Sequence, residues 1–498
     1  MTITSIRIFS LTALILISAG PAVVAAGQRS SSMGLYPWAA VARNAAVGPG
    51  AEYYPASTDP YVPGPAAGRY PGTLAYTVIR QVNGMGPQFF LLIRSVGNAG
   101  ESKAPPCFRL DSSGTCDYRP QFLPGTPYVA WRSGSFGDRY RHYNLDIIDL
   151  RLNRSKQIVY FADDQRLSWA ADGRSLAHVG GDAGYSLYDG PTGLGLIDVP
   201  TGPITDLSRA RAGRGCQNGR LPAWDHARLL FTAWLRSPNG GAWPTGPPDV
   251  WESAPAGQAP RRLVSQGWLP APSPDGRWIA FLGWPGLNQT AGAAQSAPFP
   301  GDEQRLCLYD RRTGRRWPVT PVAKAVDMAF APQMVWMQDG RRLVIAETIG
   351  SDLVSGAPRE RIVVRLVKVG DIIERVERRL SAGQPVVRPL VSFPAQGDEP
   401  FNAYWEEMLP RFQALRPARD GRCLLYIRSR DLPAGAPVGD PLDQVHGQDT
   451  TVNALDLDTG KSEEICHVGE NWGVDFVEGR VSAHPASKSV VGLHIGKQ

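Results

Sequence analysis

The chain has 498 residues and a formal net charge of +6, with basic and acidic residues interspersed and no basic block. This charge pattern makes nucleic acid an unexpected partner, and six cysteines are too sparse to form the framework of a fold this long. The 54 glycines, 44 prolines and 14 tryptophans disfavour long helices and favour many short strands joined by turns.

The first residues have the features of a signal peptide. Arg7 precedes an apolar run from Ile8 to Ala19, Gly20-Pro21 breaks the run, and small residues continue to Ala26. The run is too short to cross roughly 30 Å of hydrocarbon. We therefore expect cleavage near Ala26, a signal peptide over 1–26, no transmembrane segment in the mature chain, and a periplasmic or secreted monomer.

Residues 27–65 form a proline- and glycine-rich arm that contains the stretch GPGAEYYPASTDPYVPGP. Beyond it, one pattern recurs: Asp-Gly-Arg followed by alternating apolar residues. The four close copies are Ala170–Gly180, Ser273–Gly283, Met337–Glu347 and Ala418–Arg428, and degenerate copies occupy Leu123–Arg132, Ala223–Trp234 and Ala483–His494. Asp-Gly between two strand-like runs predicts a hairpin, because glycine accepts a positive φ and aspartate caps the turn.

A second pattern, Asp-x-x-Thr-Gly, follows several of these copies. It occurs in Leu196–Gly202, Leu308–Gly314 and Leu455–Gly460, and a looser version spans Ile147–Val159. Each instance predicts another hairpin. One unit therefore consists of four antiparallel strands, a to d, in which Asp-Gly joins a to b and Thr-Gly joins c to d.

Such units begin near residues 118, 166, 220, 267, 329 and 412. Radially repeated four-stranded units predict an all-β fold, a β-propeller over 66–498. Residues 73–110 and 473–498 would supply one more blade from the two ends of the chain, which closes the ring and removes its unpaired strand edges. This gives seven blades, with six and eight as the alternatives.

The repeat resembles that of TolB-type propellers, which is also found in the propellers of prolyl oligopeptidases and dipeptidyl peptidases. The resemblance covers about 66–498 and implies a rigid binding platform in the periplasm or outside the cell. TolB itself has an N-terminal α/β domain, whereas only the arm precedes the propeller here. The chain is therefore expected to be a TolB-like protein and not TolB.

Catalytic motifs are not evident. The pattern Gly-x-Ser-x-Gly of a nucleophile elbow does not occur, and the seven histidines show no metal-ligand spacing. We read Asp-Gly-Arg as turn chemistry, with the arginine free to pair with carboxylates of neighbouring blades. No cofactor is expected. The alternative is a propeller enzyme that binds calcium through carboxylates at the central channel, of a lactonase, lyase or glycosidase type.

Cys107 and Cys116 flank a loop-like segment and are a candidate disulfide. The sequence leaves open how Cys216, Cys307, Cys423 and Cys466 pair, although Cys307 reads as a small buried side chain within a strand.

The a-b and c-d turns are tight, whereas the b-c loops are long. The long ones are Gly180–Gly193, Leu235–Asp249, Trp284–Arg305, Glu347–Arg361 and Arg428–Thr451, and a long d-a connection spans Ser381–Arg411. Long loops displayed by a rigid scaffold commonly carry function. We therefore expect one face of the ring to bind a protein or a cell-envelope component. The candidate binding residues are Tyr185, Tyr188, Trp243, Trp284, Tyr404 and Trp405.

Overall fold

The computed structural model describes most of the strands expected from the repeats. The described residues are 52–54, 70–82, 86–97, 107–110, 120–123, 126–137, 140–151, 154–159, 168–170, 175–181, 192–198, 204–206, 216–226, 228–235, 247–253, 260–283, 304–322, 332–349, 361–378, 386–394, 412–431, 448–471 and 473–479.

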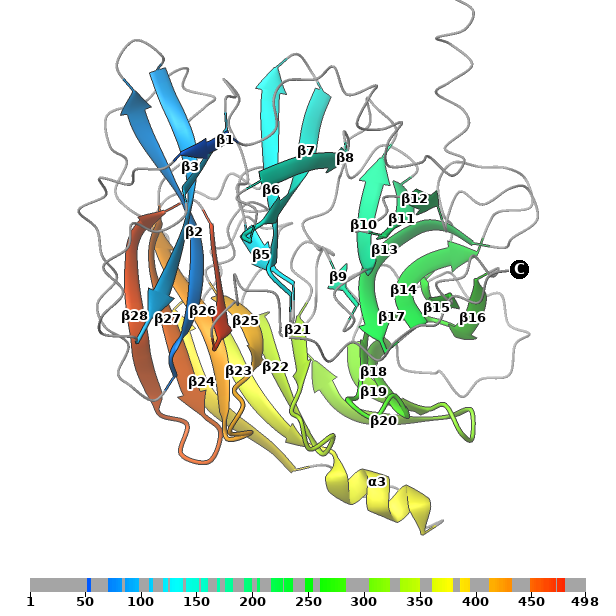
Figure 1. Ribbon diagram of the computed structural model, residues 1–498. Helices are drawn as coiled ribbons and strands as arrows, with labels where there is room; N and C mark the ends of the chain where they lie inside the picture. The colour runs from blue at the N-terminus through cyan, green and yellow to red at the C-terminus, as the bar shows by residue number, and fades with distance from the viewer. Residues whose placement is uncertain are drawn as a thin grey trace, which may run out of the picture.

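The described strands form seven antiparallel sheets arranged as the blades of a β-propeller (Figure 1). Blade 1 contains β29 (Val474–Glu478), β2 (Gly72–Val82), β3 (Gly86–Val96), β4 (Cys107–Leu110) and β1 (Glu52–Tyr54). Blade 2 contains β5 (Pro120–Phe122), β6 (Tyr128–Gly137), β7 (Tyr140–Asp149) and β8 (Arg154–Val159). Blade 3 contains β9 (Ser168–Trp169), β10 (Ser175–Gly181), β11 (Thr192–Asp198) and β12 (Ile204–Asp206).

The remaining four blades follow the same order along the chain. Blade 4 contains β13 (Cys216–Asp225), β14 (Arg228–Leu235), β15 (Asp249–Ser253) and β16 (Arg261–Val264). Blade 5 contains β17 (Gly267–Pro272), β18 (Trp278–Gly283), β19 (Gln304–Asp310) and β20 (Arg315–Val322). Blade 6 contains β21 (Gln333–Trp336), β22 (Arg342–Ile349), β23 (Arg361–Lys368), the helix α3 (Gly370–Glu377) and β24 (Val386–Pro394). Blade 7 contains β25 (Phe412–Pro417), β26 (Cys423–Asp431), β27 (Gln448–Asp456) and β28 (Ser462–Asn471).

Blade 1 confirms the expected closure of the ring. Its strand order is β1-β4-β3-β2-β29, so the C-terminal strand β29 pairs with the N-terminal strand β2 in a register that runs from Gly72 opposite Glu478 to Tyr76 opposite Val474. β29 takes the place of strand a, and β1, from within the expected arm, adds a fifth strand at the outer edge. The predicted seven blades are confirmed.

The hydrophobic core consists of separate layers between neighbouring blades. Because side chains alternate across a strand, each sheet contributes one set of apolar residues to the layer before it and another to the layer after it. Trp278 and Leu308 of blade 5, for example, pack with Leu343 and Ile345 of blade 6, whereas Phe281 and Cys307 pack with Leu230 of blade 4. A blade therefore buries its two faces only when both neighbours are present.

The two faces of the ring differ in their connections. The a-b and c-d turns lie on one face, here called the tight-turn face, and the b-c and d-a connections leave from the other, the long-loop face. Residues 284–303, 350–360 and 432–447 separate strands b and c in blades 5, 6 and 7. In blades 1 and 2 the b and c strands are themselves long, at 10 or 11 residues, and extend at the top of Figure 1.

Blade 6 departs from the expected arrangement in two ways. Its c-d connection contains α3, so the tight-turn face also carries an insertion, at the bottom of Figure 1. The segment Ser381–Arg411, expected to be one long d-a connection, instead contains the strand β24. The expectation that all insertions lie on one face was therefore wrong for this blade.

Candidate functional site

The turns of the tight-turn face are built as the repeat predicts. Asp275, Asp339 and Asp420 each accept a hydrogen bond from the backbone N–H of the arginine two residues later, at 3.2, 2.8 and 2.8 Å. The glycine between them has a φ of +68°, +61° and +66° in the three turns. These values lie in the left-handed region that glycine adopts without steric cost. The Asp-Gly pair therefore builds the turn in each blade.

The Asp-x-x-Thr-Gly turns use their aspartate in the same manner. Asp310 Oδ1 accepts the backbone N–H of Arg312 at 2.9 Å, and its Oδ2 accepts the Thr313 hydroxyl at 3.0 Å. Burial alone would raise the pKa of Asp310, but hydrogen bonds led by that from Arg277 outweigh it and hold the pKa below its ordinary value. Asp310 is therefore an ionised carboxylate buried at the end of β19.

The two turn motifs of one blade also contact each other. Arg277 pairs with Asp310 at 3.3 Å, and Arg422 pairs with Asp456 at 3.6 Å. The arginine of Asp-Gly-Arg thus reaches a carboxylate of its own blade at these positions, whereas the sequence led us to expect carboxylates of a neighbouring blade. Arg341 likewise pairs within blade 6, with Glu374 of α3 at 2.8 Å.

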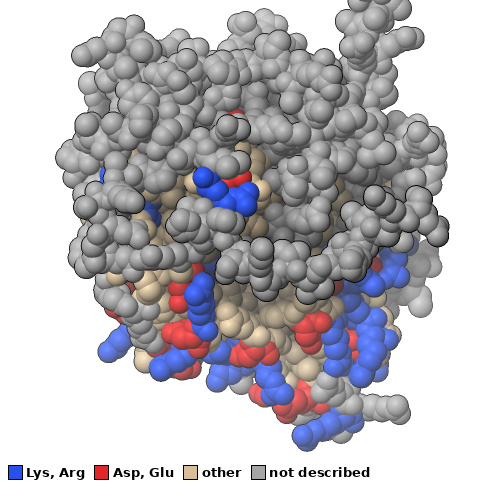
Figure 2. All heavy atoms as spheres, viewed as in Figure 1, with Lys and Arg blue, Asp and Glu red and all other residues tan. Residues whose placement is uncertain are grey.

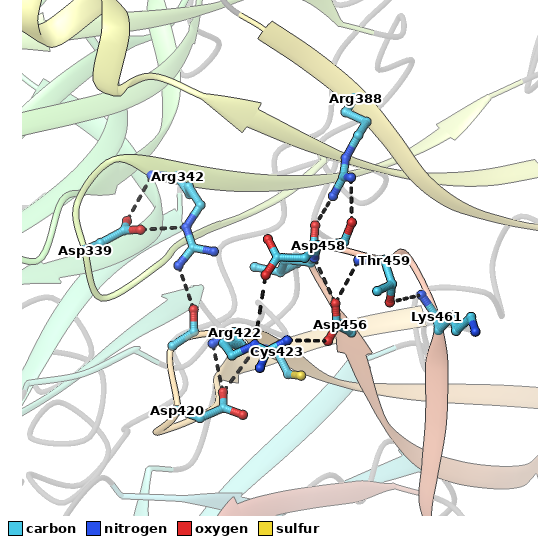
Figure 3. A network of polar contacts seen from close by, with 12 residues as sticks. Asp339, Arg342, Arg388, Asp420, Arg422, Cys423, Asp456, Asp458, Thr459 and Lys461 are labelled. Atoms are coloured by element: carbon cyan, nitrogen blue, oxygen red, sulfur yellow. Dashed lines mark hydrogen bonds and ion pairs between the residues drawn. The ribbon is translucent and has the colours of Figure 1, made fainter.

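Contacts between blades are made by other arginines, as Figure 3 shows for blades 6 and 7. Arg342 pairs with Asp339 at 2.6 Å and donates through Nη2 to the carbonyl oxygen of Gly421 at 2.7 Å. Arg388 of β24 donates to the carbonyl oxygens of Leu457 and Asp458. The turns of blade 7 are therefore held by side chains from blade 6.

An arginine of blade 5 links it to two carboxylates of blade 4. Arg311, in the c-d turn of blade 5, pairs with Asp225 at 2.7 Å and with Glu252, both in blade 4. Burial, the largest effect, raises the pKa of Asp225. Burial opposes ionisation of Glu252 too, but hydrogen bonds from Arg311 and Arg261 prevail and lower its pKa. This cluster is a structural clamp at the tight-turn face.

A buried carboxylate of β29 links three blades at the seam of the ring. Asp475 of β29 accepts the backbone N–H of Phe122 in blade 2 at 2.6 Å and pairs with Arg416 of blade 7 at 3.0 Å. Burial raises the pKa of Asp475, against the lowering effect of Arg416 and of the backbone donors. The sequence did not reveal this residue, because its partners lie in strands that are distant along the chain.

On the long-loop face, the described part of blade 7 carries a histidine paired with an aspartate. His467 of β28 shares a hydrogen bond with Asp449, the second residue of β27, and 46% of the His467 side chain is exposed. Arg428 and Thr451 occupy the neighbouring register positions. An imidazole oriented by a carboxylate can hydrogen-bond a ligand. The His467–Asp449 pair is therefore a candidate ligand contact on the long-loop face, within the described residues.

The aromatic residues proposed as a binding set lie outside the described residues: Tyr185, Tyr188, Trp243, Trp284, Tyr404 and Trp405. Cys107 lies in β4, but Cys116 also falls outside them, so the proposed disulfide stays a prediction. Cys307 is buried in β19, as expected. Burial raises the pKa of the Cys307 and Cys466 thiols to about 12, so both are protonated at neutral pH.

In the described part of the chain, no three His, Cys, Asp or Glu side chains gather as a metal site would require. Within the same ranges no helix is long and apolar enough to cross a membrane.

The fold and the turn chemistry define this chain as a β-propeller of seven blades. No protein-family model and no curated protein matches it. Similar solved structures include a putative TolB from Agrobacterium tumefaciens, at 14% identity and a TM-score of 0.34, covering 67% of this chain and 91% of that one. Another is the β-propeller domain of the Trilobed protease from Pyrococcus furiosus, at 11% identity and a TM-score of 0.41. That alignment covers 84% of this chain and 95% of that one.

An oligogalacturonate lyase solved with manganese is similar at 12% identity and a TM-score of 0.40, and the alignment covers 76% of this chain and 95% of that one. At these identities the likeness concerns the fold and does not extend to an activity.

Proposed function

We propose that this chain is an exported β-propeller that binds a protein or another cell-envelope component through its long-loop face. The observation that carries the proposal is that the connections on the two faces of the ring differ in length. Tight-turn connections such as 311–314 and 457–461 are short and bonded to their own or neighbouring blades. The b-c connections 284–303 and 432–447 leave the rigid blades on the opposite face, where a binding surface can vary without disturbing the fold.

Export is part of this proposal and rests on the features of residues 1–26. Expression of the full chain in a Gram-negative host, followed by fractionation and mass spectrometry, tests it. We expect the mature chain to start near Gly27 in the periplasm or the medium. An unprocessed chain that starts at Met1 and stays in the cytoplasm would contradict export.

The choice of face is tested by quantitative pull-down from envelope extract of the source cells. In one variant 284–303 is replaced by a short Gly-Ser linker, in a second 432–447 is replaced in the same way, and a third carries His467→Ala. The matched control carries Asp458→Ala and Lys461→Ala in a tight-turn-face connection. Melting temperatures establish that each variant is folded.

We expect the two loop variants and His467→Ala to lose partners that the control retains, since these three alter the long-loop face and the control does not. Retention of every partner by both loop variants, or equal losses in the control, would show that the choice of face is wrong.

A further inference from the structure

The tight-turn face of blades 4 and 5 carries a group of exposed arginines. Arg228 begins β14, Arg261 begins β16, Arg312 lies in the c-d turn of blade 5, and Arg315 begins β20 directly after that turn. The side chains of Arg228 and Arg261 are 54% and 65% exposed, and Arg312 and Arg315 are also exposed. We call these four residues the arginine patch.

Most of the carboxylates next to the arginine patch are buried beneath it, although Asp275 in the a-b turn of blade 5 is exposed. Glu252, whose side chain is 5% exposed, pairs with Arg228 at 3.4 Å, with Arg261 at 2.6 Å and with Arg311. Asp225 and Asp310 are also buried, and the half-buried or buried arginines Arg277 and Arg311 already neutralise them. The positive charges therefore face the solvent, and most of the negative charges do not.

Local contacts hold two of these arginines in place. The backbone N–H of Arg312 is bonded to Asp310 at 2.9 Å, which fixes the turn. The Arg315 guanidinium lies over the Trp317 ring at 5.8 Å from its centroid, a cation–π contact that restricts the side chain. Two arginines are thus presented from an ordered turn, which reduces the entropy lost when an anion binds.

Blades 6 and 7 show a different charge pattern on the same face. Arg341 pairs there with Glu374, and Arg422 lies 3.9 Å from Asp458. These acidic side chains are 41% and 65% exposed, so both signs reach the solvent. In Figure 2, blue side chains gather at the lower right, beside the region of β16 to β20, whereas red and blue alternate elsewhere along the lower surface.

We propose that the arginine patch binds the anionic headgroup surface of a membrane. Its arginines lie on short turns and strand starts of one face, so a flat surface can meet them together, whereas a linear polyanion would need a groove that follows its backbone. Guanidinium groups bind phosphate oxygens in a bidentate geometry. The proposal goes beyond the proposed function and stands without it. It places the long-loop face away from the membrane.

Cosedimentation with lipid vesicles tests this proposal. The full chain is mixed with vesicles of phosphatidylcholine alone or of phosphatidylcholine with phosphatidylglycerol, at low and high salt. We expect binding to the anionic vesicles only and weaker binding at high salt, because salt screens charge over about 8–10 Å. Binding to both vesicle types, or to neither, would overturn the proposal. Stronger binding to duplex DNA or to an acidic polysaccharide in parallel assays would also overturn it.

Substitutions distinguish the effect of the arginine patch on vesicle binding from the effect of the overall net charge. Each membrane-contacting arginine is expected to contribute about fivefold in affinity, which corresponds to about 1 kcal/mol. The pair Arg312→Gln and Arg315→Gln leaves the pairs of Glu252 intact, and it should reduce binding about 25-fold. Addition of Arg228→Gln and Arg261→Gln should reduce it by a hundredfold or more.

The matched control replaces Arg341, Arg378, Arg422 and Lys461 by Gln, and so removes four positive charges from blades 6 and 7 on the same face. It should bind anionic vesicles within about threefold of the unmodified chain. Equal losses in the control and in the four-residue patch variant would show that net charge, and not the patch, is responsible.

Discussion

Glycine occupies equivalent turn positions in blades 5 and 7 for two different reasons. Gly314 and Gly460 have φ values of +69° and +72°. A Cβ on Gly314 would meet nothing within 4 Å, whereas a Cβ on Gly460 would lie 2.9 Å from the carbonyl oxygen of Leu390 in blade 6. Gly314 is therefore required only by its backbone conformation, and Gly460 also permits two blades to approach.

Substitution by alanine separates these two effects. Gly314→Ala should cost about 1–2 kcal/mol in the free energy of unfolding, for the left-handed backbone alone. Gly460→Ala should cost roughly 1–3 kcal/mol more, because the methyl group would push against a backbone oxygen. Urea unfolding of both variants measures the difference. Equal costs would mean that blade 6 moves away from the turn without penalty.

Asp310 makes the free energy of unfolding depend on pH, and the direction of this dependence follows from its lowered pKa. Its pKa is lower in the folded state than in the unfolded state, so its stabilisation is present above the unfolded value of about 3.9 and is lost as the pH falls through the folded value. Asp310→Asn should therefore lower the free energy of unfolding by about 1–2 kcal/mol at neutral pH, and the difference should shrink below about pH 4.

Urea titrations of the Asp310→Asn variant and the unmodified chain at several pH values measure this dependence. Asp458→Asn is the control, because Asp458 is 65% exposed and lies 3.9 Å from its partner Arg422. Its effect should stay within about 0.5 kcal/mol. A difference for Asp310→Asn that does not change with pH would contradict the assigned ionisation.

The sequence predicted the turn residues well and their partners poorly. The roles of Asp275 and Gly276 follow from local backbone chemistry, which acts within a few residues. The partner of Arg277 depends on which turn lies beside it in the folded blade, and this information is not local. The contacts of the clamp residue Arg311 and of the seam residue Asp475 were not predictable for the same reason.

The closing strand β29 depends on its one large apolar side chain. Phe476 is fully buried between blades 1 and 7, and Gly72 leaves room for its ring, since a Cβ there would lie 2.3 Å from it. Phe476→Ala should reduce the free energy of unfolding by about 3–5 kcal/mol. Calorimetry measures this loss, and Phe476→Leu, as the conservative control, should lose less.

Opening of the seam is expected to accompany that loss. Limited proteolysis should therefore remove the segment around β29 from the Phe476→Ala variant before it cleaves the other blades. If the seam stays protected while the stability falls, Phe476 would stabilise the core without holding the ring closed.

Blade 6 shows where the strand pattern fails as a predictor. β24 contains Pro389, and a proline argues against a strand because it donates no hydrogen bond. In the structure β24 is an outer strand, and Pro389 lies at a register shift opposite Arg365. An edge position and a bulge both tolerate proline. The helix α3 was missed because its short amphipathic segment interrupts what is elsewhere a tight turn.

At the scale of the whole molecule, the blades should unfold together. The core lies between blades, so the loss of one sheet exposes apolar surface on two others. Thermal unfolding followed by tryptophan fluorescence and by far-ultraviolet circular dichroism should therefore give coincident transitions. Separate transitions would indicate that groups of blades are stable alone.

The number of blades, the closure by both ends and the inequality of the two faces were predictable, because each follows from counting repeats and connections. The arginine patch was not. Its residues come from positions 228 to 315 and meet only because turns of adjacent blades lie side by side, and the overall charge of +6 conceals how unevenly it is distributed.

The position of β29 in the chain also determines when folding can finish. All other described strands precede β29 along the sequence, yet it occupies the innermost position of the first blade. During synthesis, the sheets of blades 2 to 7 can form before β29 is available to pair with the inner edge of β2. The ring is thus completed last, and until then a chaperone that binds the chain meets an unclosed arc in which the inner edge of β2 is unpaired.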